Sequence, residues 1–226
     1  MSMYHSFFFY FSNMILAIVR PPFFVLIYWD KRCFNHLLVM LFVVYPKKRE
    51  VSTLYDSLGG DVYDMRYEDE QNDKYDLIFE NIPSNSDDLT LDLGCGTGLL
   101  VRRITAYTIG LDISPVLIKK AKSRTKGSVN VQYVLADAEN VPFRQCMFSA
   151  IYAITIIQNA PNPEKLICEI IFSSRRSGII VITALKKAYT KERFLNLLAS
   201  SGLYFLNIVD DERSKDIIAV TKPIHS

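Results

Sequence analysis

Residues 89–98 read LTLDLGCGTG, a short apolar stretch followed by three glycines at alternate positions. The apolar stretch predicts a buried strand over 89–93. The glycines at 94, 96 and 98 permit a tight turn and let a ligand approach the backbone. The apolar and basic residues 99–105 predict a helix, whose N-terminus would favour an anionic group. This order of strand, glycine loop and helix is typical of α/β proteins that bind a ligand at the carboxyl ends of parallel strands.

The alternation of strands and helices continues to the C-terminus. Ser114-Pro115 and Asn162-Pro163 each supply an N-cap followed by proline, and Gly202 is placed to end the last helix. The pattern predicts helices at 63–80, 115–123, 162–174 and 191–200, and strands at 89–93, 107–111, 131–136, 150–155, 178–183, 203–209 and 216–221. We therefore expect an α/β fold: a Rossmann-like, doubly wound, mostly parallel seven-stranded sheet with a C-terminal antiparallel strand pair.

Acidic residues follow the second and third predicted strands. Asp112 ends one strand and Asp137 follows the next, so both should lie at the same sheet edge as the glycine loop. A carboxylate at position 112 can accept both ribose hydroxyls of an adenosine, and Asp137 can accept from the adenine amino group. A nicotinamide dehydrogenase is disfavoured because the third glycine falls one residue earlier than in the dinucleotide pattern.

Four ordered segments carry a resemblance to a known family: LDLGCGTG at 91–98, GLDISP at 110–115, ADAENVPF at 136–143 and FSAIYAITIIQNAPNPEK at 148–165. They resemble the motifs of class I S-adenosylmethionine (SAM) dependent methyltransferases, specifically the type 11 group that includes ubiquinone and menaquinone biosynthesis enzymes. The resemblance implies SAM as the cofactor. It implies a binding site made by Asp92, Gly94, Cys95, Gly96, Thr97, Gly98, Asp112, Ile113, Asp137, Ala138 and Ile154.

The roles implied by this resemblance follow the parts of the cofactor. Asp92 and the loop Gly94–Gly98 would hold the methionine part, Asp112 the ribose, and Asp137 with Ala138 the adenine. The Tyr63-Asp64 pair, and the helix that carries Gln71, Lys74 and Tyr75, resemble the lid of such enzymes.

The methyl acceptor is not defined by the sequence. The family commonly has FD where this chain has Phe148-Ser149, a histidine pair where it has Gln158-Asn159, and a glycine-rich turn where it has residues 174–178. Methyl transfer depends mainly on how the two reactants are positioned, and a base is needed only if the acceptor must lose a proton. No histidine lies between residues 37 and 224 to act as that base. No catalytic residue is assigned; residues near the expected mouth are Tyr63, Tyr67, Tyr75, Glu139 and Gln158.

We expect transfer to a small-molecule acceptor. The alternatives are an RNA or protein methyltransferase working with a small activator subunit, and a SAM-binding module without catalysis. Residues 51–226 hold 20 basic and 22 acidic side chains, so charge gives no support for nucleic-acid binding.

Residues 1–50 differ in composition from the rest. They are rich in aromatic and aliphatic residues and carry a net charge of +4. Arg20-Pro21-Pro22 and Asp30-Lys31-Arg32 interrupt the apolar runs, which disfavours a spanning helix. We expect either a membrane-associated extension or translation annotated too far upstream, with Val51 as the true start, and a methyltransferase domain over 51–226.

The cysteines and histidines indicate neither a metal site nor a disulfide framework, because Cys33, Cys95, Cys146 and Cys168 form no C-x-x-C pair. Scattered thiols suit a reducing cytoplasm, with membrane association through the N-terminal segment as the alternative. Cys146 and Cys168 are expected to be small buried apolar residues.

Overall fold

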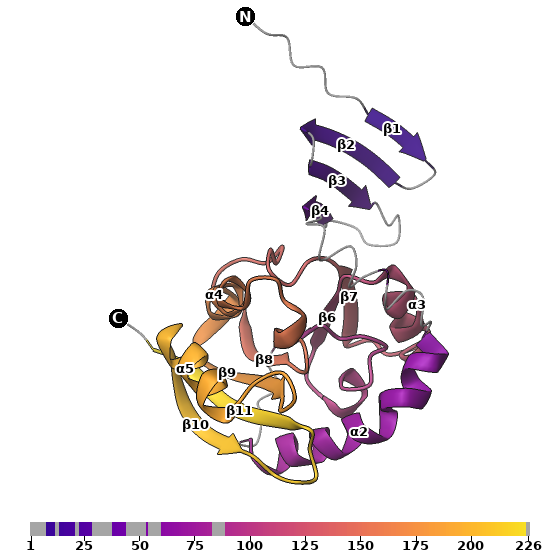
Figure 1. The fold of residues 1–226 in the computed structure, drawn as a ribbon. Helices are drawn as coiled ribbons and strands as arrows, with labels where there is room; N and C mark the ends of the chain where they lie inside the picture. The colour runs from indigo at the N-terminus through magenta and orange to yellow at the C-terminus, as the bar shows by residue number, and fades with distance from the viewer. Residues whose placement is uncertain are drawn as a thin grey trace, which may run out of the picture.

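The computed structural model describes residues 8–11, 14–20, 23–28, 38–43, 53, 60–82 and 89–224. Its main sheet has seven strands in the order β10-β11-β9-β8-β5-β6-β7 (Figure 1). Pairing is parallel from β9 through β8, β5 and β6 to β7, and β11 is antiparallel to both β9 and β10. The strands are Thr90–Leu93 (β5), Thr108–Asp112 (β6), Val131–Leu135 (β7), Phe148–Ala153 (β8), Ser174–Leu185 (β9), Leu203–Val209 (β10) and Asp216–Pro223 (β11). The predicted fold class is confirmed, with the last strand inserted between β9 and β10.

In the part of the chain that the structure describes, four α-helices pack around this sheet: Gly60–Glu80 (α2), Pro115–Arg124 (α3), Pro163–Ser173 (α4) and Lys191–Ser200 (α5). The expected N-caps are present, since Ser114 Oγ accepts from Leu117 N and Asn162 Oδ1 accepts from Lys165 N. Gly202 follows α5 with φ +89°, a left-handed conformation that glycine adopts without steric cost. Local sequence signals therefore set the ends of these helices.

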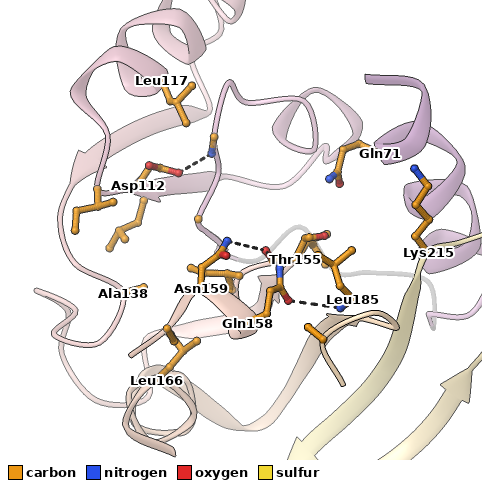
Figure 2. A pocket seen from close by; sticks show the side chains of 18 of the residues that line it. Gln71, Asp112, Leu117, Ala138, Thr155, Gln158, Asn159, Leu166, Leu185 and Lys215 are labelled. Atoms are coloured by element: carbon orange, nitrogen blue, oxygen red, sulfur yellow. Dashed lines mark hydrogen bonds between the residues drawn. The ribbon is translucent and has the colours of Figure 1, made fainter. Parts of the chain in front are cut away.

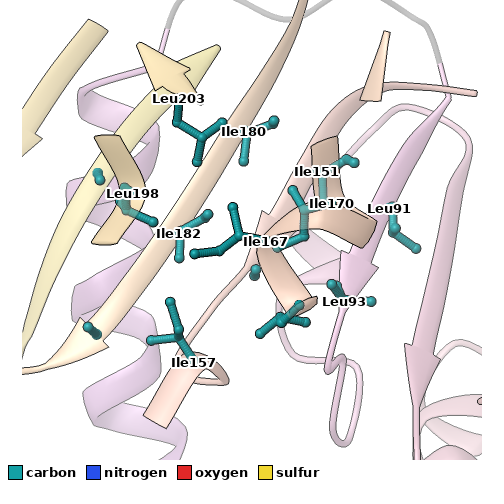
Figure 3. Packing of buried hydrophobic residues seen from close by; sticks show 14 of the residues in the cluster. Leu91, Leu93, Ile151, Ile157, Ile167, Ile170, Ile180, Ile182, Leu198 and Leu203 are labelled. Carbon is teal, nitrogen blue, oxygen red and sulfur yellow. The ribbon is translucent and has the colours of Figure 1, made fainter. Parts of the chain in front are cut away.

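Both faces of the sheet are buried, as a doubly wound fold requires. Leu91, Ile151 and Ile182 point to one face and pack with side chains of α4 and α5, among them Ile167 and Leu198 (Figure 3). Tyr152, Val181 and Ile218 point to the other face and pack with Leu77 and Ile78 of α2. Successive residues of a strand alternate between faces, so each buried strand contributes to both clusters.

The helix expected over 99–105 is not an α-helix. Turns at 96–100 lead into a single 3₁₀ turn, Val101–Arg103 (η1), and Ile104 is already extended at φ −102° and ψ 127°. The next strand begins at Thr108, so the segment after Gly98 is too short for several helical turns. Leu99, Leu100 and Val101 are all buried. Three consecutive residues of an amphipathic helix point in different directions, so they would not all face the core.

Two further expectations were wrong. The strand predicted over 178–183 is longer, because β9 begins at Ser174, directly after α4 ends at Ser173, and continues to Leu185. Cys146 and Cys168 are exposed rather than buried, whereas Cys95 is buried. Cys168 lies on α4 between the buried residues Ile167 and Ile170 but faces outward, since only one side of that helix meets the sheet.

In the N-terminal segment, the structure describes four strands that form an antiparallel sheet in the order β1-β2-β3-β4. They are Phe8–Phe11 (β1), Met14–Arg20 (β2), Phe23–Tyr28 (β3) and Leu38–Val43 (β4). Within the described ranges, no helix has the length and apolar character needed to cross a membrane. A domain boundary near residue 51 stays a prediction.

Candidate functional site

A cavity of about 930 Å³ opens at the carboxyl ends of the parallel strands. Figure 2 shows Asp112 and Leu117 at one end of it, Gln71 and Lys215 at the opposite end, and Asn159 and Gln158 between them. The volume lies near the upper limit of small-molecule sites, roughly 300–1,000 Å³. Open α/β sheets bind their ligands at this edge, so topology alone makes it the candidate site.

The glycine loop is fixed to the end of the neighbouring strand. Gly94 N and Cys95 N both donate to Leu111 O, over 2.7 and 2.9 Å. Gly96 N donates to Asp112 Oδ2 over 2.9 Å. Gly94 and Gly96 have φ of +80° and +53°, which glycine adopts without steric cost. The loop backbone is therefore held at the cavity wall.

Asp112 is oriented by the backbone on both of its carboxylate oxygens. Oδ1 accepts from Ser114 N over 2.8 Å, while Oδ2 accepts from Gly96 N. Each carboxylate oxygen can accept more than one hydrogen bond, so Asp112 can also accept from ligand hydroxyls. Its side chain lines the cavity in a fixed direction.

A second carboxylate, Asp137, lies beyond the end of β7. Its Oδ1 accepts from Glu139 N over 2.9 Å and its Oδ2 from Asn140 Nδ2 over 2.7 Å. Asp137, Ala138 and Glu139 line the same cavity. The Glu139 carboxylate accepts from Asn162 N over 3.0 Å and so joins this loop to the start of α4.

Asp92 differs from both, because one of its oxygens has no partner. Oδ2 is buried and accepts no hydrogen bond from any described residue. Burial, together with the nearby Asp112 carboxylate, raises the pKa of Asp92 from 3.8 to about 8. Asp92 faces a small cavity of about 20 Å³ that shares Gln71, Gly94 and Ile154 with the large one. A buried carboxylate in this position calls for a cationic or hydrogen-donating group.

The predicted site residues divide between these cavities. Gly94, Gly96, Asp112, Ile113, Asp137, Ala138 and Ile154 line the large cavity. Asp92, Cys95 and Thr97 line the small one. Thr97 is also held from behind, since Arg124 Nη1 donates to both its O and its Oγ1 over 2.7 Å. Gly98 lines neither cavity, and it packs against Tyr133 and Ala121. Ligand contact by all eleven residues stays a prediction.

The helix expected to act as a lid contributes differently along its length. Glu70 and Gln71 of α2 line the cavity. One turn later, Lys74 is buried and lines neither cavity, whereas the buried Tyr75 lines the small cavity together with Asp92. The side chains of Tyr63 and Tyr67 lie outside the described residues. The C-terminal half of α2 is thus a fixed wall of the site.

A polar cluster beneath the cavity was missed by sequence reasoning. Lys74 Nζ lies 3.1 Å from Asp216 Oδ2, and both side chains have no exposed surface. Thr155 and Thr183 also bond to Asp216 Oδ2, over 2.8 and 2.5 Å. A lysine in an amphipathic helix is ordinarily read as a solvated residue, so periodicity gave no sign of this cluster.

Several lining residues lie between positions 186 and 215, a part of the chain that was not expected to contribute. Because β11 is antiparallel, its beginning lies at the same edge as the end of β9, and Asp216 pairs with Leu185. This brings Lys186, Lys187, Glu212, Ser214 and Lys215 to the cavity. The predicted antiparallel pair joins β10 to β11, whereas these residues reach the cavity through the pairing of β11 with β9, which was not predicted.

Comparison with known proteins agrees with this site. Residues 91–182 match the methyltransferase domain family. The chain is 29% identical over 150 residues to the malonyl-[acyl-carrier protein] O-methyltransferase of Marinomonas sp., covering 64% of this chain and 55% of that protein. The chain spans about half the length of the curated relatives it matches.

Solved structures share the fold. A Haloferax volcanii methyltransferase, solved in complex with the activator Trm112, superposes with a TM-score of 0.67 at 15% identity, covering 76% of this chain and 98% of that one. A SAM-dependent methyltransferase from Aquifex aeolicus superposes with a TM-score of 0.61 at 13% identity, over 80% and 100%.

The sheet order, the glycine loop and the strand-end carboxylates define a class I methyltransferase fold with its ligand edge intact. Residues 91–182 match the methyltransferase domain family, and the chain is similar in sequence to methyltransferases and in fold to SAM-dependent methyltransferases.

SAM is the cofactor that this family implies, and the described residues fit it. The unpartnered Asp92 oxygen suits an ammonium group, and the fixed Asp112 carboxylate suits a ribose. Glycine is needed at position 94, because its φ is +80° and a Cβ there would lie 2.8 Å from Ile156 Cδ1, which lines the cavity. Among the described residues, no group of three His, Cys, Asp or Glu side chains could hold a metal ion.

Proposed function

We propose that this protein transfers a methyl group from SAM to a small-molecule acceptor. The observation that carries the proposal is that Gly96, Asp112 and Asp137, from three successive strand ends, line one cavity of about 930 Å³. Each is held by the hydrogen bonds given above, so bonds within the protein fix the three groups in place. A preformed site lowers the entropic cost of binding.

The chain's own residues hold and orient the reactants. Asp92 and the loop Gly94–Gly98 would bind the methionine part of the cofactor, Asp112 the ribose, and Asp137 with Ala138 the adenine. When bound, SAM supplies a methyl group already activated by its sulfonium. The contribution of the protein is then to place a nucleophile in line with that group and to keep water away.

The acceptor would lie in the part of the cavity away from Asp112, which provides hydrogen-bonding groups and no imidazole. Gln71, Thr155, Gln158 and Asn159 line it, and no histidine lies between residues 37 and 224. The carboxylates of Glu70, Glu139 and Glu212 also line the cavity, so its lining excludes a histidine base but provides carboxylates that could accept a proton.

Size and charge favour a small acceptor over a nucleic acid. The cavity has room beside a cofactor for a compact molecule, and residues 51–226 carry a net charge of −2. Binding of a polyanion depends on basic patches that neutralise phosphates. We propose the cytoplasm as the compartment, where the free thiols of Cys95, Cys146 and Cys168 stay reduced.

A second candidate is a methyltransferase that works with a small activator subunit. It is favoured by the Haloferax volcanii structure, in which a chain of the same fold is complexed with Trm112. Copurification of a small protein with the tagged chain from its native cells would support this alternative.

Transfer of labelled methyl groups from SAM into fractionated cell extract tests the proposal. We expect label in a fraction of low molecular mass, and no label with the Asp112→Ala variant. Label in RNA or protein would favour the second candidate. If no fraction is labelled although the protein binds SAM, the chain is a binding module without this activity.

A further inference from the structure

The buried cluster around Lys74 joins four separate parts of the chain. Lys74 comes from α2, Asp216 begins β11, Thr183 lies in β9, and Thr155 follows β8. Lys74 Nζ donates to Thr155 Oγ1 over 2.6 Å and pairs with Asp216 Oδ2 over 3.1 Å. Thr155 N donates to Thr183 Oγ1 over 2.8 Å. Separating a buried charge from its partner is costly, so the bonds to Asp216 Oδ2 hold the four elements together, while Asp216 Oδ1 accepts no hydrogen bond from any described residue.

Thr155 is the member of this cluster that reaches the cavity. It lines the cavity wall and has φ +56°, in the left-handed region that a β-branched residue rarely adopts. Such a conformation persists only when surrounding contacts fix it. Here the Thr155 hydroxyl accepts from Lys74 Nζ and donates to Asp216 Oδ2, and the Thr155 backbone N–H donates to Thr183 Oγ1.

The direction of the Thr155 carbonyl in turn fixes the side-chain amides of Gln158 and Asn159, which line the cavity. Gln158 Nε2 donates to Thr155 O over 2.5 Å, and Asn159 Nδ2 approaches the same oxygen at 3.5 Å. Gln158 Oε1 accepts from Leu185 N at 3.5 Å, so the amide is held at both ends (Figure 2). Gln158 and Asn159 line the cavity between the Asp112 end and the Lys215 end.

We propose that Lys74 is a positioning residue for the acceptor. Its ammonium, held with Asp216 and the Thr155 hydroxyl, keeps Thr155 in the left-handed conformation and so sets the orientation of the Gln158 amide towards the acceptor. This inference rests on the proposed methyl transfer. The proposed role of Lys74 concerns the acceptor and not the cofactor, because Lys74 lines neither cavity and has no described contact with Asp112 or the glycine loop.

Two substitutions test the proposal. Lys74→Met removes the charge, and Thr155→Val removes the hydroxyl at nearly constant volume while leaving the Lys74–Asp216 pair. We expect both to bind S-adenosylhomocysteine as the wild type does. Both should transfer labelled methyl groups at least about tenfold more slowly, because misplacement of a reacting group by about 1 Å can cost about 10²-fold. Thr155→Ser, which keeps the hydroxyl, should recover most of the rate that Thr155→Val loses.

A spectroscopic readout needs neither cofactor nor acceptor. In ¹⁵N-labelled protein, the side-chain amide signals of Gln158, identified by their loss in Gln158→Glu, should shift or broaden in Lys74→Met and Thr155→Val. The exposed Lys122→Met on α3 is the matched control and should leave them unchanged. If Lys74→Met does not fold, Thr155→Val carries the test.

The outcomes are distinguishable. Unchanged Gln158 signals in folded Thr155→Val, or wild-type transfer rates in both variants, would overturn the positioning role and leave the proposed function standing. A wild-type protein that binds no S-adenosylhomocysteine would instead overturn the proposed function, and the amide signals would still decide whether Lys74 orients Gln158.

Discussion

The Gly96 backbone N–H donates to Asp112 Oδ2 over 2.9 Å, across sixteen positions of sequence. This bond ties the glycine loop after β5 to the end of β6. The carboxylate that would hold a ribose therefore also shapes the loop beside it. A substitution of Asp112 should therefore affect ribose binding and the conformation of the glycine loop together.

Replacing Asp112 with alanine should weaken binding of S-adenosylhomocysteine roughly 10–100-fold, because hydrogen bonds to a charged group contribute about 1.5–3 kcal/mol. Calorimetric titration measures this, with circular dichroism to establish that the variant is folded. Asp73→Ala, at an exposed position of α2, is the control and should bind normally. Equal affinity of the two variants for S-adenosylhomocysteine would show that Asp112 is not part of the binding site.

The buried pair of Lys74 and Asp216 should be more sensitive to loss of one partner than of both. Lys74→Met leaves a buried carboxylate unpaired and should lower the free energy of unfolding by about 3–5 kcal/mol. The double variant Lys74→Met/Asp216→Leu should recover much of this loss, since no buried charge remains. Urea unfolding compares the two. A double variant as unstable as the single one would show that the charge pair is not the source of the effect.

Asp92 should make the unliganded protein less stable as the pH rises. Its pKa is about 8 in the folded protein and 3.8 ordinarily, so the folded state holds the proton more tightly. Its stabilising contribution is complete below pH 3.8 and is lost as the pH rises through 8, at up to about 1.4 kcal/mol per pH unit. Asp92→Asn should lack this loss.

Urea unfolding from pH 5 to 9 checks that expectation. The stability of Asp92→Asn relative to wild type should increase with pH up to about 8 and then stay constant. A difference that does not vary with pH would mean that Asp92 is ionised throughout, and that a partner already satisfies its carboxylate.

Two glycines with similar backbone conformations should respond differently to alanine. Gly98 has φ +77° and a Cβ there would lie 2.7 Å from Tyr133 Oη, whereas Gly202 has φ +89° and open space around it. Gly202→Ala should cost only the left-handed strain, about 1–2 kcal/mol. Gly98→Ala should cost more because neighbours must also move. Thermal unfolding measures both, and equal losses would mean that the contact with Tyr133 is readily relieved.

Much of this architecture could be predicted from local signals. Ser114-Pro115, Asn162-Pro163 and Gly202 mark helix ends by their own chemistry, and the structure bears them out. The strand ends that bring Asp112 and Asp137 to one cavity follow from the parallel order. These features depend on residues close together in sequence, which is why they were accessible.

What could not be predicted depends on distant contacts. The partnership of Lys74 with Asp216 joins residues 142 positions apart, and no periodicity indicates it. The 3₁₀ turn at Val101–Arg103 replaces an expected helix because of the short distance to β6 and because three successive residues are buried. Tertiary packing overrides local propensity in both cases.

Calorimetric titration of the wild-type protein with S-adenosylhomocysteine and, separately, with NAD tests whether the edge formed by Gly96, Asp112 and Asp137 binds an adenosyl amino acid. We predict saturable binding of S-adenosylhomocysteine at one site per chain and no heat with NAD. The absence of a binding heat with S-adenosylhomocysteine, or equal binding of NAD, would contradict the assignment of this cavity as a SAM site.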